Sequence, residues 1–222
     1  MSIENQLSTV KHRLPEHVTL VAVSKMHPAS AVEEAYAAGQ RIFGESRPQE
    51  LREKYDLLPK DIEWHMIGHL QTNKVKYIAP FVALIQSVDS ARVLEAIQKE
   101  AAKNERVIDI LLEIHVAQEE TKTGWDYEEL RTYLATGALA QMPNVRVRGV
   151  MGIATNTEDE AVVRADFDAL RHHFEELKPQ FGVTFDTLSM GMSGDYPLAI
   201  ECGSTMVRVG SFIFGARDYS KK

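Results

Sequence analysis

The chain has 222 residues, of which 44% are hydrophobic and 26% are charged, and its formal net charge is −7. That length is ample for one domain with a sizeable core, and the composition is that of a globular protein. An acidic chain without blocks of lysine and arginine is a poor candidate for non-specific binding to nucleic acid or to an anionic membrane. Any phosphate site must therefore be local and formed by a few residues.

The chain contains one cysteine, Cys202. A single cysteine excludes an intrachain disulfide bond and fits a reducing compartment. Residues 1–17 show neither the apolar core nor the small-residue cleavage site of a signal peptide, and no apolar run has the length of a membrane span. We therefore expect a cytoplasmic protein.

Short runs rich in β-branched residues alternate with longer segments of helical period along the chain. These runs predict strands at 18–23, 41–43, 62–67, 81–88, 107–115, 145–153, 184–190 and 205–209. The short second run carries the weakest pattern.

The segments between the runs carry the apolar stripes of amphipathic helices. The clearest stripe recurs in steps of three and four at Val163, Phe167, Leu170, Phe174 and Leu177. A second stripe lies near the N-terminus at Ile3, Leu7, Val10 and Leu14. Further helices are expected after Pro28, with Gly39 as the stop, and after Asp89 or Ser90 as the cap.

A strand followed by a helix, repeated about eight times, predicts a parallel sheet with helical crossovers. Eight units in a chain of this length favour a single (β/α)8 TIM barrel over residues 1–222, with a doubly wound open sheet as the alternative. In such a barrel, chemistry lies at the C-terminal ends of the strands. The residues just after each run are therefore the candidates for function.

The first strand is followed directly by Ser24-Lys25-Met26. A lysine at this point would lie at the mouth of the barrel, where partial desolvation lowers its pKa and frees the amine as a nucleophile. The alternative is an exposed lysine that opens a loop, which is the commoner situation when position alone is considered.

The last two units suggest an anion site. Arg208 lies inside an apolar strand, where it must find an acceptor, and the following turn Gly210-Ser211 offers backbone N–H groups and a hydroxyl. A helix is expected to open at Ser193, and a serine-capped helix N-terminus also binds anions. The alternative is that Ser193 only caps its helix while Arg208 pairs with a structural carboxylate.

Other polar residues give weaker signals. His65 could line the cavity, but it is more readily explained as a hydrogen-bonded packing residue. No pair of histidines has metal-ligand spacing with a supporting carboxylate, so we expect no metal site. Cys202 lacks a partner base and is expected to pack as a small apolar residue.

Seven separated segments resemble motifs of the YggS/PROSC family of pyridoxal phosphate homeostasis proteins. They are Ala22-Val23-Ser24-Lys25 with Pro28, Phe43-Gly44-Glu45 with Gln49-Glu50, 64–71 with Asn73-Lys74, Lys122-Thr123-Gly124, 188–193, 203–208 and 214–217. Together they cover nearly the whole chain in order.

The resemblance implies a (β/α)8 barrel like the N-terminal domain of alanine racemase. It also implies pyridoxal 5'-phosphate (PLP) as the cofactor, held as a reversible Schiff base on Lys25. Arg208 matches the arginine that faces the pyridine nitrogen. Ser193, Gly210 and Ser211 match the positions that hold the phosphate.

The sequence departs from the family pattern at Ser46-Arg47, where the family often has Asn-Tyr. In the family this asparagine lies close to the cofactor. The shorter Ser46 therefore leaves a contact on the ring side in doubt, and we do not count it as a ligand.

Arg208 opposite the pyridine nitrogen implies weak catalysis. Arginine cannot accept a proton, so the nitrogen would stay unprotonated and the ring would be a weak electron sink. Racemisation needs acid–base groups on both faces of the substrate, and in alanine racemases one comes from an additional β-domain. This chain ends at Lys222 without room for such a domain.

The family thus implies a carrier for PLP in vitamin B6 homeostasis, with no catalytic residues, rather than an enzyme. The alternative is a small PLP-dependent amino-acid racemase or lyase, and a scaffold without cofactor is a third reading. Expected partners are PLP and apo PLP-dependent enzymes as recipients, with neither nucleic acid nor membrane. A barrel that needs no second domain is expected to be a monomer.

Overall fold

Each strand of the protein pairs in parallel with the next strand along the chain, and the last strand returns to pair with the first. The computed structural model describes residues 2–216, so Arg217 of the last motif lies outside the described residues. The barrel is formed by β1 (Thr19–Val23), β2 (Ile42–Glu45), β3 (Glu63–Met66), β4 (Leu84–Val88), β5 (Ile108–Glu113), β6 (Val145–Met151), β7 (Thr187–Met192) and β8 (Met206–Val209). The closed (β/α)8 barrel is confirmed, and the open sheet is excluded.

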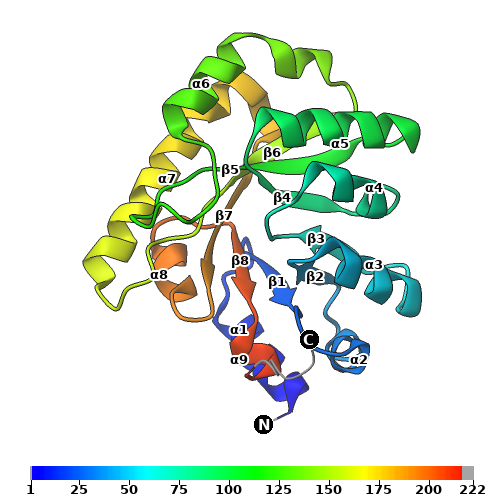
Figure 1. Cartoon of the computed structure of the whole chain (residues 1–222). Helices are drawn as coiled ribbons and strands as arrows, with labels where there is room; N and C mark the ends of the chain where they lie inside the picture. Colours follow the sequence, from blue (N-terminus) through cyan, green and yellow to red (C-terminus); the bar gives the residue numbers. More distant parts are fainter. Residues whose placement is uncertain (1, 217–222) are drawn as a thin grey trace.

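Helices follow the strands and surround the barrel (Figure 1). They are α1 (Ile3–Arg13), α2 (Ala29–Ala37), α3 (Pro48–Leu57), α4 (Val75–Ile78), α5 (Ala91–Lys103), α6 (Tyr127–Ala135), α7 (Glu160–Phe181), α8 (Tyr196–Glu201) and α9 (Ser211–Phe214). Short 3-10 turns lie at Thr72–Lys74, Ala138–Gln141 and Gly182–Thr184. No helix among residues 2–216 is long and apolar enough to cross a membrane.

Capping side chains explain where several helices begin. Ser2 accepts from the backbone N–H of Asn5 at the start of α1, and Asp126 accepts from two N–H groups at the start of α6. Pro28 precedes α2 as expected, and Gly39, with φ of +84°, follows its end. The Ser2 and Asp126 side chains satisfy N–H groups that have no partner within their helices.

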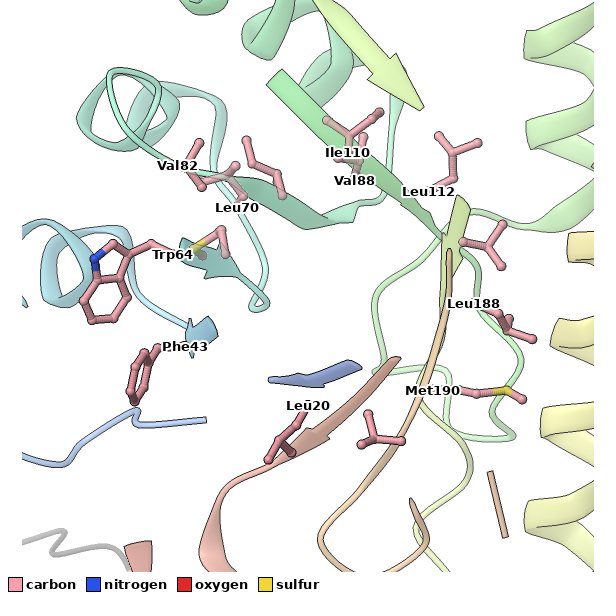
Figure 2. Close-up of a cluster of buried hydrophobic side chains, with 14 of the residues drawn as sticks. Leu20, Phe43, Trp64, Leu70, Val82, Val88, Ile110, Leu112, Leu188 and Met190 are labelled. Carbon is pink, nitrogen blue, oxygen red and sulfur yellow. The ribbon is translucent and has the colours of Figure 1, made fainter. Parts of the chain in front are cut away.

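The core has two parts, because alternate strand residues face opposite sides of the sheet. The outer part lies between strands and helices, and Figure 2 shows its side chains radiating away from the barrel axis, among them Phe43 and Trp64. Cys202 belongs to this part and is 2% exposed, as expected for a small apolar residue. The inner part consists of Val21, Leu84, Leu111, Met151 and Met206. These residues come from strands on opposite sides of the barrel, so they mark its axis.

One expected boundary is wrong. No helix opens at Ser193: β7 runs on to Met192, and α8 begins at Tyr196 with Asp195 as its N-cap residue. The Met192 N–H donates to Oδ1 of Asp195 at 2.5 Å, and the Asp195 N–H donates back to the Met192 carbonyl at 3.2 Å. This closed turn holds Ser193 outside the helix and frees its side chain for another role.

Candidate functional site

Lys25 follows β1 directly, at the C-terminal end of the barrel. Val21 of the same strand faces the barrel axis, whereas the Ser24 hydroxyl donates at 2.6 Å to Oε1 of Glu45, toward the helix α3. Because successive residues alternate between the two faces, Lys25 is directed to the mouth of the barrel. Lys25 is partly buried. Its position is therefore not that of a fully exposed loop lysine.

Arg208 lies on β8, beside β1, in register with Val21. Its guanidinium is buried, and it donates to Oγ of Ser189 at 2.6 Å and to the carbonyl of Gly152 at 2.9 Å. Burial lowers the pKa of Arg208 to about 10, while the charges of Glu113 and Asp195 act to raise it. Both acceptors are neutral oxygens, and no carboxylate of residues 2–216 forms an ion pair with this side chain. The alternative of a structural ion pair for Arg208 is therefore wrong.

A chain of hydrogen bonds leads from Arg208 across the interior of the barrel. Ser189 donates to Oε1 of Gln86 at 2.7 Å, and Nε2 of Gln86 lies 2.9 Å from Nδ1 of His65. Burial lowers the pKa of His65 to about 3, so its ring is neutral at physiological pH. Since the Gln86 amide donates, Nδ1 accepts and the ring proton lies on Nε2. His65 is thus a hydrogen-bonded packing residue, as expected.

The two segments expected to hold an anion meet in the structure. The backbone N–H of Gly210 donates to Oγ of Ser193 at 3.1 Å, and Ser211 follows as the first residue of α9. A side chain at position 210 would place its Cβ 3.0 Å from the carbonyl oxygen of Val23, so this turn packs on the end of β1. The Ser193 oxygen accepts from Gly210, which leaves the hydroxyl proton to donate to a ligand.

Glu113 is a residue that the sequence interpretation did not select. It ends β5 two residues after the inward-facing Leu111, and it is 3% exposed. Its Oε1 accepts from the Thr123 hydroxyl at 2.9 Å, but its buried Oε2 has no hydrogen-bond partner in the described part of the chain. Burial raises the pKa of Glu113 to about 7, and the nearby charge of Arg208 opposes that shift. The signal was present, because an acidic residue stood near the end of a predicted strand.

The arrangement offers an amine, a guanidinium and a serine–glycine turn on the adjacent strand ends of β7, β8 and β1. A hydroxyl and a glycine turn can donate hydrogen bonds to a phosphate. A guanidinium can donate to a neutral ring nitrogen, and an amine can attack a carbonyl carbon. The residues therefore fit a small phosphorylated aldehyde. Among residues 2–216, no group of three His, Cys, Asp or Glu side chains is arranged to hold a metal ion.

The chain matches known proteins over nearly its full length. The model of the family described as alanine racemase, N-terminal domain, matches residues 1–218. A pyridoxal phosphate homeostasis protein of Aquifex aeolicus is 43% identical over 201 residues, which cover 90% of this chain and 87% of the relative. The protein of the same name from Escherichia coli K12 is 41% identical over 217 residues, covering 95% of this chain and 90% of the relative.

Solved structures also match this chain over nearly its full length. PipY of Synechococcus elongatus PCC7942, determined with PLP bound, is 39% identical and superposes with a TM-score of 0.88, covering 96% of this chain and 100% of PipY. Alanine racemase from Streptomyces lavendulae is 20% identical with a TM-score of 0.78, covering 97% of this chain and 59% of the racemase. At that identity the likeness to the racemase concerns the fold alone.

Proposed function

Because this chain belongs to the family of pyridoxal phosphate homeostasis proteins, with the barrel of the alanine racemase N-terminal domain, we propose that it binds PLP as a reversible Schiff base on Lys25. The observation that carries the proposal is the convergence of Lys25, Arg208 and the bonded pair Ser193–Gly210 at neighbouring strand ends. PipY, a relative with PLP bound, supports the same cofactor. The whole barrel is proposed to act as one PLP-binding domain.

Each residue has a separate task in this proposal. When bound, PLP supplies an aldehyde that condenses with an amine, with loss of water, and a pyridine ring that withdraws electrons. Lys25 would provide that amine, and exchange with a second amine would release PLP from Lys25 again. Ser193, Gly210 and Ser211 would form the phosphate site: the hydroxyls of Ser193 and Ser211 would donate to the phosphate, and the Gly210 N–H, which donates to Ser193 Oγ, would orient the Ser193 hydroxyl. Arg208 would donate to the ring nitrogen.

Arg208 favours a carrier over an enzyme. Its guanidinium keeps its own protons, since burial lowers its pKa only to about 10, and it therefore cannot act as a proton acceptor at neutral pH. An unprotonated ring nitrogen is a weak electron sink, which disfavours transamination and decarboxylation. We propose that the protein stores PLP and passes it to apo PLP-dependent enzymes, acting as a cytoplasmic monomer.

One observation favours a second candidate function, a weak amino-acid racemase or lyase. Glu113 has an unpartnered buried oxygen among the described residues and a pKa raised by burial to about 7. A carboxyl group with that pKa can both donate and accept a proton near neutral pH. It would be the second acid–base group that racemisation requires beside the amine of Lys25.

The cofactor is tested by absorbance and by borohydride reduction. The purified protein is expected to show the Schiff-base band, and reduction followed by peptide mapping should place the pyridoxyl group on Lys25. Lys25→Ala should lose both signals, whereas Lys76→Ala, a change of an exposed lysine on α4, should keep them. A wild-type protein reconstituted with PLP that carries no adduct would contradict the proposal.

The carrier and the enzyme differ in proton exchange. Amino acids are incubated with the PLP-loaded protein in deuterated water, and loss of the α-proton is followed by NMR. A carrier gives exchange no faster than free PLP. Rapid exchange that disappears in Glu113→Gln would establish the racemase or lyase instead.

A further inference from the structure

A buried cluster of charges lies directly behind Lys25, between β1, β2 and the helix α3. Lys54, on α3, is 5% exposed, and its ammonium donates to three oxygens. Its acceptors are the carbonyl of Ser24 at 2.7 Å, Oε1 of Glu45 at 2.7 Å and Oε1 of Glu50 at 2.8 Å. All three N–H groups of the ammonium are therefore used.

The cluster holds the backbone on both sides of Lys25. On the N-terminal side, Lys54 binds the Ser24 carbonyl, and the Ser24 hydroxyl donates to Glu45 at 2.6 Å. On the C-terminal side, the N–H of Met26 donates to Oε1 of Glu50 at 2.6 Å. The two peptide groups that flank Lys25 thus bond to side chains of one cluster.

Met26 needs such a contact. Its φ is +64°, a left-handed conformation that costs a residue with a side chain free energy relative to the right-handed one. A residue stays in that conformation only where its surroundings hold it. The short bond from the Met26 N–H to the Glu50 side chain is a contact that holds it there.

Stability alone is a weak explanation for this cluster. Removing buried charges from water is costly, and well-packed apolar residues serve a helix–barrel contact equally well or better. The two acidic side chains, Glu45 and Glu50, meet at one ammonium, and they accept from Ser24 and Met26 on either side of Lys25. Their shared feature is the backbone that they fix.

We propose that Lys54, together with Glu45 and Glu50, is a positioning cluster that fixes the direction of Lys25 and thereby sets how long the protein retains PLP. This inference rests on the proposed function of Lys25. With the phosphate held by the turn at Gly210, the Lys25 amine must meet the aldehyde at a fixed distance, and a fixed backbone keeps its effective concentration high. A loosened turn lowers that concentration, so a released aldehyde escapes more often before it is recaptured.

The test measures the rate of PLP loss. Methoxyamine, which traps released PLP as an oxime, is added to each PLP-loaded protein, and the decay of the Schiff-base band is followed. Glu50→Ala is expected to lose PLP roughly tenfold faster, because it removes an acceptor for the Met26 N–H and for a buried ammonium. Glu50→Gln keeps an acceptor for Met26, so it should return the rate to within about threefold of wild type.

The matched control is Asp56→Asn on the same helix. Asp56 pairs with Arg52 at 2.8 Å on the exposed surface of α3 and does not contact the turn. Its substitution should leave the release rate unchanged. If Glu50→Ala does not fold, Met26→Gly replaces it: glycine accepts the left-handed φ but leaves the turn flexible, and faster release is again expected.

The outcomes separate three cases. Faster release in Glu50→Ala with rescue in Glu50→Gln supports the positioning cluster. If Glu50→Ala and Met26→Gly release PLP at the wild-type rate, even with a lowered denaturation midpoint, the cluster is only structural and the inference is wrong. A wild-type protein without a borohydride adduct on Lys25 overturns the proposed function itself, which is a different result.

Discussion

The guanidinium of Arg208 donates a 2.6 Å hydrogen bond to the hydroxyl of Ser189, so a buried cation is bound by a neutral oxygen. The Ser189 hydroxyl in turn donates a hydrogen bond to Oε1 of Gln86 at 2.7 Å, so it accepts and donates at once. This arrangement keeps the positive charge of Arg208 uncompensated by any direct carboxylate contact among residues 2–216. A donor of that kind can face a neutral ring nitrogen without supplying a base beside it.

Ser189→Ala is expected to destabilise the protein. The substitution leaves one guanidinium N–H of Arg208 and the amide oxygen of Gln86 without partners in a site that is 0% exposed at Ser189. Unsatisfied buried groups of this kind cost on the order of 2–3 kcal/mol. Urea denaturation of the apoprotein measures the loss. Thr187→Ala, which removes a hydroxyl bonded to the exposed side chain of Asp186, should cost well under half as much.

Ser193→Ala tests the phosphate site. The substitution removes the hydroxyl that accepts from the Gly210 N–H and would donate to the phosphate. We expect the affinity for PLP to fall roughly tenfold, the effect of one hydrogen bond to a charged group, while the affinity for pyridoxal, which has no phosphate, stays unchanged. Fluorescence titration with both compounds gives the two constants. Equal losses of affinity for PLP and pyridoxal would show that Ser193 does not contact the phosphate. The control is Ser8→Ala, a change on the exposed surface of α1, which should leave both affinities unchanged.

Gly124→Ala tests the turn that positions the Thr123 hydroxyl for its hydrogen bond to Glu113. Gly124 has φ of +135°, and an added Cβ would lie 2.5 Å from the backbone nitrogen of His115. The clash with backbone cannot be relieved by a side-chain movement, so we expect a loss above about 2 kcal/mol in urea denaturation. Gly137→Ala is the control, because φ there is also positive, at +72°, but the added Cβ has open space. Equal losses in both variants would show that backbone conformation alone is responsible.

The fold could be predicted because the spacing of apolar residues shows which side of each helix or strand is buried. Strand runs and helix stripes follow from which side of each element is buried, and the barrel followed from their alternation. The start of α8 could not be predicted in this way. The turn between Met192 and Asp195 delays the helix through a side-chain bond that competes with helix formation, and a cap at Ser193 was the simpler interpretation.

The site could be predicted only in part. Lys25 follows β1 and Arg208 lies on β8, at strand ends that a barrel brings to its mouth, so position and resemblance made them candidates. The contact of Ser189 with Gln86 spans 103 residues, and that of Gln86 with His65 spans 21. No periodic pattern encodes such pairs, because each depends on how the closed barrel aligns its strands. The cluster around Lys54 was missed for the same reason.

Glu113→Gln should change how stability depends on pH. Burial raises the pKa of Glu113 from the ordinary value of 4.5 to about 7 in the folded protein. Between these two values the folded state binds one more proton than the unfolded state, so the free energy of unfolding of the wild type falls as pH rises from about 4.5 to 7. Glutamine does not ionise and removes this term. The variant and the wild type should therefore be about equally stable at pH 4.

At pH 8 the Glu113→Gln variant should be more stable than the wild type by on the order of 1–3 kcal/mol. Burial also raises the pKa of Glu45, to about 7, so the wild type retains a second pH-dependent contribution of the same sign. The difference between the two proteins isolates Glu113, since Glu45 is present in both. Urea denaturation of the apoproteins at pH 4, 6 and 8 gives the three differences. A difference that does not grow with pH would mean that folding does not raise the pKa of Glu113, so the group would be ionised at neutral pH and could not be the proton donor of the racemase or lyase alternative.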